Sequence, residues 1–265
     1  MKIYFLNLFF VFMTLTACSG EKRYVLNQQE DLIYKNLLLD HVKTELDGSE
    51  VGDEQMRKIT GDIVKINAVD LQREYEKNEV AADLKFLKKT ILIEGVVGSI
   101  DRGIGESYYI KFQGNQNSFI SPHASMADGY VNFLASLKKG EKIKLICIGD
   151  GLLIGTPRLR QCMRIDDFAL LKIKQIPLAV ISNQNSEENG LKIYSMTFAI
   201  LINESSVCWA SLEPTTKCIS EIKTLFQETN NSLEKHNEFK RISEQMIQKV
   251  KIQTGVDASQ FLKNQ

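Results

Sequence analysis

The chain has 265 residues, of which 43% are hydrophobic and 25% are charged, the values of an ordinary globular protein with a substantial core. This length accommodates one compact domain together with smaller attached segments. The 33 basic and 33 acidic residues cancel, so the chain lacks the basic excess that phosphate neutralisation gives to a dedicated nucleic-acid binder.

The first 17 residues have the layout of a secretory signal: one basic residue, a short apolar stretch and then small residues. The stretch is too short for a spanning helix. It ends in Leu15-Thr16-Ala17-Cys18, which resembles the lipobox of bacterial lipoproteins, whose cysteine is acylated and becomes the first residue after cleavage. The resemblance predicts a signal peptide over 1–17 and palmitate-bearing Cys18 as a membrane anchor. An ordinary signal peptide or an uncleaved anchor is the alternative.

The residue after the cysteine bears on location. Ser19 stands where an aspartate would favour retention at the inner membrane in Gram-negative lipoproteins. The expected location is therefore the cell envelope, at the outer membrane and facing the periplasm.

Four cysteines remain after Cys18, at 147, 162, 208 and 218. Four cysteines allow three pairings, and spacing favours Cys147 with Cys162 and Cys208 with Cys218. An exported location permits both disulfide bonds, because that compartment is oxidising. Four reduced, buried thiols would be expected only in a cytosolic protein.

Residues 18–58 are predicted to form a tether followed by a helix over 28–46. Apolar residues recur there at helical spacing, and Glu30 and Asp31 lie in the first turn. The helix is expected to pack its apolar face on the barrel described below, and a partner-binding arm is the alternative interpretation.

The stretch from 60 to 163 organises the rest of the chain. A helical pattern over 69–83, which Asn67 could cap, precedes apolar runs at 90–100, 107–113, 117–121, 142–148 and 158–163. A second helix, over 128–138, separates the third and fourth runs and is expected to turn three side chains inward, Val131, Leu134 and Leu137. This order indicates a five-stranded barrel. Gly95 and Gly98 suit a strand that coils sharply to close it.

These residues resemble the bacterial OB-fold family labelled tRNA-anti-like, found mainly in exported or lipid-anchored proteins. The matching pieces are EYEKNEVAAD at 74–83, IEGVVGSI at 93–100, LKKGEKI at 137–143 and the spaced Cys147 and Cys162. The resemblance implies an α+β fold with a five-stranded Greek-key OB barrel over 59–170 and flanking helices. It also implies that the two cysteines meet across adjacent strands. It implies no reaction.

Beyond the barrel, 166–181 is predicted as an extended apolar segment lying on it, and 171–190 as extended chain and linker. Residues 191–265 are predicted as a mainly helical C-terminal region, a helical hairpin stapled by Cys208–Cys218.

The sequence contains no Gly-rich phosphate loop, no HExxH, no Gly-x-Ser-x-Gly and no CxxC. Its three histidines, at 41, 123 and 236, lie in separate regions. We therefore expect no catalytic residues, no metal site and no cofactor, and interpret the chain as a non-enzyme.

The predicted function is a lipid-anchored binding or adaptor module for an envelope protein, peptide or glycan. OB barrels commonly bind on the face of strands two and three, which places Tyr109, Lys111, Gln113 and Phe119 in the candidate binding face. Nucleic-acid binding through the same face is the alternative. The cations available for it are Lys138, Lys139, Lys142, Lys144, Arg158 and Arg160.

Overall fold

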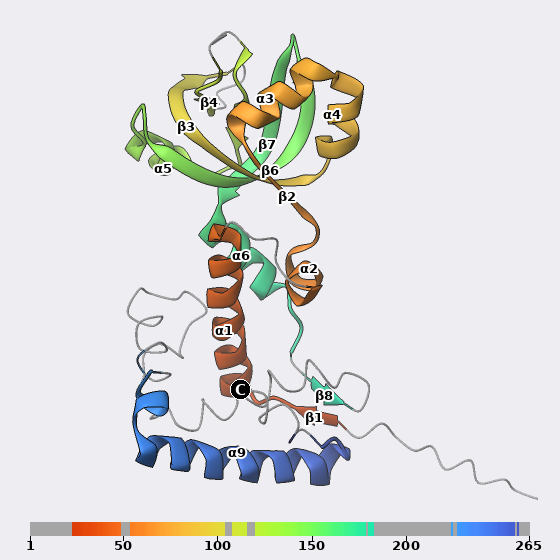
Figure 1. The fold of residues 1–265 in the computed structure, drawn as a ribbon, viewed down its shortest axis with the longest axis vertical. Coiled ribbons are helices and arrows are strands. Elements are labelled where there is room, and N and C mark those ends of the chain that lie inside the picture. The colour runs from red at the N-terminus through yellow and green to blue at the C-terminus, as the bar shows by residue number, and fades with distance from the viewer. Residues whose placement is uncertain are drawn as a thin grey trace, which may run out of the picture.

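The computed structural model describes residues 23–48, 54–103, 108–115, 120–178, 180–182, 224, 227–257 and 259. A β-barrel lies at one end of the molecule and helix α9 (Leu233–Thr254) at the other (Figure 1). Helix α1 (Gln28–Asp47) runs between them. We call the part below the barrel, built on α1 and α9, the stem.

The barrel has five strands that close on themselves. They are β3 (Thr90–Arg102), β4 (Tyr108–Phe112), β5 (His123–Met126), β6 (Lys142–Leu153) and β7 (Thr156–Arg164). Neighbouring strands follow the order β3-β4-β5-β7-β6, and β6 pairs back onto β3. All pairs are antiparallel except β5 with β7, which is the Greek-key crossover. The predicted α+β fold with a five-stranded OB barrel is confirmed.

Strand β3 closes the barrel because it changes partner along its length. On one edge it pairs with β6 over 90–96; on the other, residues 97–102 pair with β4, with a register shift between Val97 and Ser99. A Cβ at Gly95 would stand 2.4 Å from the Phe112 ring, and one at Gly98 would stand 3.0 Å from the Lys111 carbonyl oxygen. Both glycines therefore permit close contacts between β3 and β4 that a side chain would block, at the strand that the sequence predicted to coil sharply.

The predicted Cys147–Cys162 bond is present. It joins β6 to β7 inside the barrel, and both residues are buried. A bond that closes a 15-residue separation is expected to contribute about 3 kcal/mol, chiefly by restricting the unfolded chain.

The helical pattern over 69–83 forms two helices instead of one. Helix α3 (Ala68–Lys77) ends at Asn78, which is extended and accepts a hydrogen bond from the Ala81 amide to begin α4 (Glu79–Phe86). The predicted cap is confirmed, because the Asn67 side chain accepts from the Asp70 amide at 2.8 Å. Figure 1 shows both helices on the side of the barrel away from the stem.

Three details of the barrel differ from the prediction. Strand β2 (Ile63–Asn67), not predicted, pairs in parallel with β3 along the edge that β4 leaves open. The third barrel strand is His123–Met126 and not 117–121, of which 117–119 lie outside the described residues. Helix α5 (Val131–Ser136) is shorter than 128–138, and Val131 is 58% exposed instead of inward.

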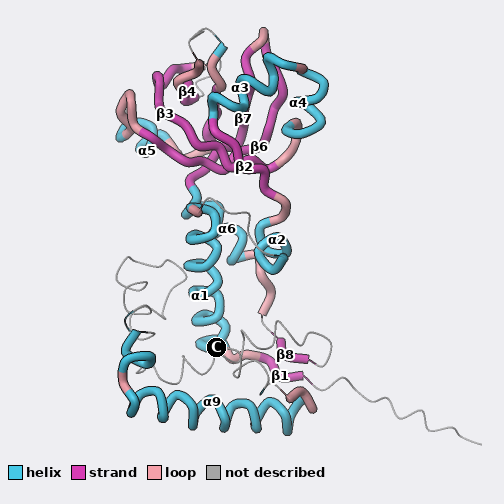
Figure 2. Tube along the Cα trace, viewed as in Figure 1, coloured by secondary structure: helices cyan, strands magenta, loops and turns pink. Residues whose placement is uncertain are grey.

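The stem has its own apolar core. Helix α1 packs on α6 (Ile165–Lys174) and shares one buried cluster with it, with α9 and with the small sheet of β1 (Arg23–Val25) and β8 (Val180–Ser182) (Figure 2). The predicted helix 28–46 is confirmed. The predicted packing of its apolar face on the barrel is wrong in the main: the face covers this second core and reaches the barrel only where Leu92 and Ile146 join the cluster.

The segment predicted as extended, 166–181, is mostly helix α6. Asp166 and Asp167 lie in its first turn and Lys172 and Lys174 in its last, a charge order that favours a helix. Of the C-terminal region, α9 and residues 227–231 are helical. The predicted Cys208–Cys218 bond, the linker 183–190 and the segment 191–202 lie outside the described residues.

Two lysines of the barrel fasten it to the stem. Helix α1 has no basic residue in its last turn, where backbone carbonyls lack partners. Lys65 of β2 donates to the carbonyls of Glu45 and Gly48 at 2.9 and 3.1 Å. Lys144 of β6 donates to the carbonyl and, at 2.8 Å, to the carboxylate of Asp47. The negative end of α1 is therefore neutralised by the barrel.

Within the described part of the chain, no helix has both the length and the apolar character that crossing a bilayer requires.

Gly149 offers a direct test of how α4 meets the barrel. A Cβ there would stand 1.9 Å from the Phe86 carbonyl oxygen. The Gly149 amide donates to the Lys89 carbonyl, and the Gly149 carbonyl accepts from the Lys88 amide. We predict that Gly149→Ala lowers the free energy of unfolding by about 1–3 kcal/mol, measured by urea denaturation. The control Gly48→Ala, at φ −69° with 3.4 Å to the nearest atom, should stay within about 0.5 kcal/mol. Equal losses would contradict the contact.

Candidate functional site on the outer face of strands β4 and β5

The outer face of β4 and β5 contains the residues that the sequence singled out. Ile110 and Phe112 are buried in the barrel core, so the alternate residues Tyr109 and Lys111 point outward and are partly exposed. Gln113 follows the strand and is exposed. The fourth predicted residue, Phe119, lies outside the described residues.

Neighbouring strands add side chains to the same face. In register with Lys111 lie Ser99 of β3 and His123 of β5, and Arg158 of β7 follows beside His123. In register with Tyr109 lie Asp101 of β3 and Ser125 of β5. We call this set the outer face; its members are Ser99, Asp101, Tyr109, Lys111, His123, Ser125 and Arg158. Four strands therefore place it on a rigid sheet.

The centre of the outer face is an aromatic stack. The rings of Tyr109 and His123 lie 4.7 Å apart between centroids and 27° from parallel. Burial lowers the pKa of the His123 imidazole below its ordinary value of 6.5, Lys111 and Arg158 lower it further, and Asp101 opposes them. The imidazole is therefore neutral at pH 7 and presents a flat, uncharged ring beside two cations.

Those two cations differ from most others on the barrel. Among the described residues, no hydrogen bond or ion pair joins Lys111 to a carboxylate, and the buried Nε of Arg158 has no hydrogen-bond partner. The one acid of the face, Asp101, accepts a hydrogen bond from the Ser99 hydroxyl at 2.8 Å. A buried donor without a partner is costly, and an anionic or carbonyl group of a ligand would satisfy it.

The end of β4 is fixed by a polar cluster from α3. Gln72, fully buried, accepts a hydrogen bond from the Asn115 amide at 3.2 Å and donates to Glu76 at 2.7 Å. A Cβ on Gly114 would stand 2.5 Å from the Gln72 carbonyl oxygen, so the chain passes close to this side chain. Gln113 is held beside the outer face as a result.

The other cations considered for a basic groove do not gather here. Lys144 binds the end of α1, Lys142 pairs with Glu94, and Arg160 pairs with Asp150 at 3.3 Å. Lys138 and Lys139 lie in the exposed turn after α5. Of the six predicted cations, only Arg158 joins the outer face.

Sequence reasoning missed His123 as a member of the site. Its strand was predicted at 117–121, which starts six residues and ends five residues too early, because Phe119 and Ile120 gave a stronger apolar signal than His123–Met126. The one signal in the sequence was the alternation of polar His123, apolar Ala124 and polar Ser125; Ala124 is buried in the structure.

Cys18, Cys208 and Cys218 lie outside the described residues. Within the described ranges, no three residues of the His, Cys, Asp and Glu types gather as a metal site would require. Two shallow hollows flank the joint between α1 and the barrel and share Asp47 and Lys144, which bind each other.

Comparisons with known proteins identify the family of the chain. A search of curated proteins finds no match. A crystal structure from Klebsiella pneumoniae subsp. pneumoniae MGH 78578, named provisionally as a nucleic acid-binding lipoprotein, is 18% identical; the match covers 43% of this chain and 98% of that one, with a TM-score of 0.33. The tRNA_anti-like family model matches residues 1–163, well over half of the chain. The chain belongs to the tRNA_anti-like family.

Proposed function

We propose that this protein is a lipid-anchored binding module of the cell envelope, whose barrel presents its outer face to a peptide, a glycan or another envelope protein. The observation that carries the proposal is the Tyr109–His123 stack with Lys111 and Arg158 beside it, on a face formed by four strands. The aromatic rings present a flat surface, and the two cations beside them have hydrogen-bond donors left for a ligand. Such a surface recognises a ligand that combines an apolar or planar group with an acidic one.

The location of this face supports the proposal. It lies over the second and third barrel strands, where OB barrels commonly bind their ligands. The preference for a protein, peptide or glycan follows from the zero net charge and from the pairing of Lys142, Lys144 and Arg160 with acids. An extended basic groove, which a long polyanion requires, does not form from those residues.

The proposal predicts that removing both cations weakens capture of the partner. The Lys111→Ala/Arg158→Ala variant should bind its partner in an immobilised envelope extract at least about 10-fold more weakly than the unaltered chain, because each charged hydrogen bond is worth about 1.5–3 kcal/mol. Lys77→Ala/Lys85→Ala is the matched control: it removes two exposed lysines that both bind Glu74 on α3. Equal retention by both variants would refute the assignment of the outer face.

Binding of single-stranded nucleic acid is the second candidate. The observation that favours it is the same stack, since bases stack on aromatic rings with little dependence on sequence and cations bind the backbone. Fluorescence anisotropy with labelled oligo(dT) in low salt separates the two candidates. Binding that weakens steeply as salt is raised, and that the Lys111→Ala/Arg158→Ala variant loses, would favour nucleic acid; no binding in low salt would exclude it.

The anchor makes a separate prediction. Cys18→Ala should abolish metabolic labelling by radioactive palmitate and move the protein from the membrane fraction to the aqueous fraction, because the acyl chains supply the membrane affinity. Ser19→Ala serves as the control and should retain the label. A Cys18→Ala protein that still takes up palmitate would refute the anchor.

A further inference from the structure

The N-terminal strand of the stem holds the start of the described chain against α9. Tyr24 and Leu26 are buried in the same cluster as Ile242, Met246 and Val250 of α9. Lys249 of α9 places its Nζ 5.4 Å from the centre of the Tyr24 ring. Strand β1 therefore begins beside α9, at the end of the molecule opposite the barrel (Figure 1).

Chain length ties this end to the anchor. Four residues lie between Cys18 and Arg23, which makes five steps along the chain. An extended chain advances at most about 3.6 Å per step, so Cys18 lies within about 18 Å of Arg23. An acylated Cys18 has its sulfur at the surface of the bilayer. The tether is thus too short to let the end of the stem that contains β1 and α9, which we call the foot, move far from the lipid.

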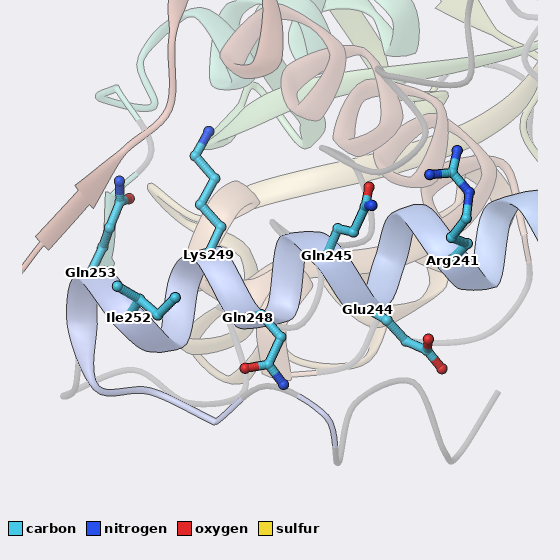
Figure 3. A pocket seen from close by; sticks show the side chains of 7 residues that line it. All are labelled: Arg241, Glu244, Gln245, Gln248, Lys249, Ile252 and Gln253. Atoms are coloured by element: carbon cyan, nitrogen blue, oxygen red, sulfur yellow. The ribbon is translucent and has the colours of Figure 1, made fainter.

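The side of α9 that points away from the stem is polar. Figure 3 shows Glu244 and Gln248 on one side of the helix and Lys249 and Gln253 on the opposite side, from which Lys249 approaches the Tyr24 ring. Arg241, Glu244, Gln245 and Gln248 are all exposed, and Ile252 is 77% exposed. Charged and amide side chains, with Leu233 and Ile252 as the large apolar residues exposed on the helix, suit the headgroup layer and not the acyl interior.

We infer that the outer side of α9 lies against the lipid headgroups of the membrane that holds Cys18, with α1 as a strut that keeps the barrel away from that surface. This inference rests on the acylation of Cys18 proposed above. Helix α1 has 20 residues and so spans about 30 Å between the foot and the barrel. The outer face of the barrel is then available to a partner that does not itself lie in the headgroup layer.

The test measures how near two points of the acylated full chain lie to lipid. A nitroxide is attached through p-acetylphenylalanine at Gln248 of α9 or at Leu84 of α4, which is 79% exposed on the far side of the barrel. The protein is reconstituted in phosphatidylethanolamine and phosphatidylglycerol vesicles doped with a nickel-chelating lipid. We expect relaxation enhancement several-fold larger at 248 than at 84. Equal enhancement, or a larger effect at 84, would overturn the inference.

Two controls identify the cause of either result. Vesicle flotation is measured first: an acylated chain that does not float refutes the anchor itself, whereas one that floats without a difference between the labels refutes only the orientation. In the second control, a 20-residue Gly/Ser insertion between Gly20 and Glu21 lengthens the tether. The difference between the two labels should then shrink, and an unchanged difference would show that the tether length does not set the orientation. A label at 248 that is immobilised without nickel enhancement would place a protein there instead and overturn the inference.

Discussion

Strand β3 is the element on which the other parts of the structure depend, because it pairs with three strands along 13 residues. Where the strand changes partners, β4 approaches its backbone too closely for a side chain to fit. Gly95 and Gly98, which have no Cβ, make this approach possible. Closure through β6 encloses Ile91 and Ile93, while Leu92 on the opposite side of the strand joins the stem core. Its last residues then carry Ser99 and Asp101 to the outer face.

The stem and the barrel are joined by electrostatics as well as by apolar contact. A helix terminus with unsatisfied carbonyls attracts cations, each worth about 0.3–1 kcal/mol near a surface. Lys65 of β2 and Lys144 of β6 supply two such charges. The carbonyls at the C-terminus of α1 therefore gain these hydrogen-bond donors only when the barrel is folded beside the helix. Lys43 of α1 adds a pair to Asp166 of α6 at 2.9 Å, which fixes a second helix to the same joint.

The sequence predicted the parts of the fold that long, regular patterns specify. Strands β3, β6 and β7, helix α1 and the Cys147–Cys162 bond all follow from runs or spacings of that kind. The errors have physical reasons. Strand β5 has four residues, too few to show a period of two, and α6 follows a strand directly, with Pro177 nearby suggesting extended chain.

The candidate site was only partly visible for a related reason. Tyr109 and Lys111 could be identified from the alternation of β4, because buried Ile110 and Phe112 flank them. His123 and Arg158 come from two other strands, and their position beside Lys111 depends on register, which local sequence does not specify. The same limit applies to Lys144, whose partner Asp47 is 97 residues away.

The central claim is that the outer face of β4 and β5 meets the partner, and photo-crosslinking in intact cells tests it most directly. p-Benzoylphenylalanine is placed at Tyr109 of the outer face or at exposed Leu84 of α4, and crosslinked products are compared after irradiation. The account predicts a discrete crosslinked species at 109 that is missing at 84 and lost in the Lys111→Ala/Arg158→Ala background. The same species from both positions, or from 84 alone, would contradict it.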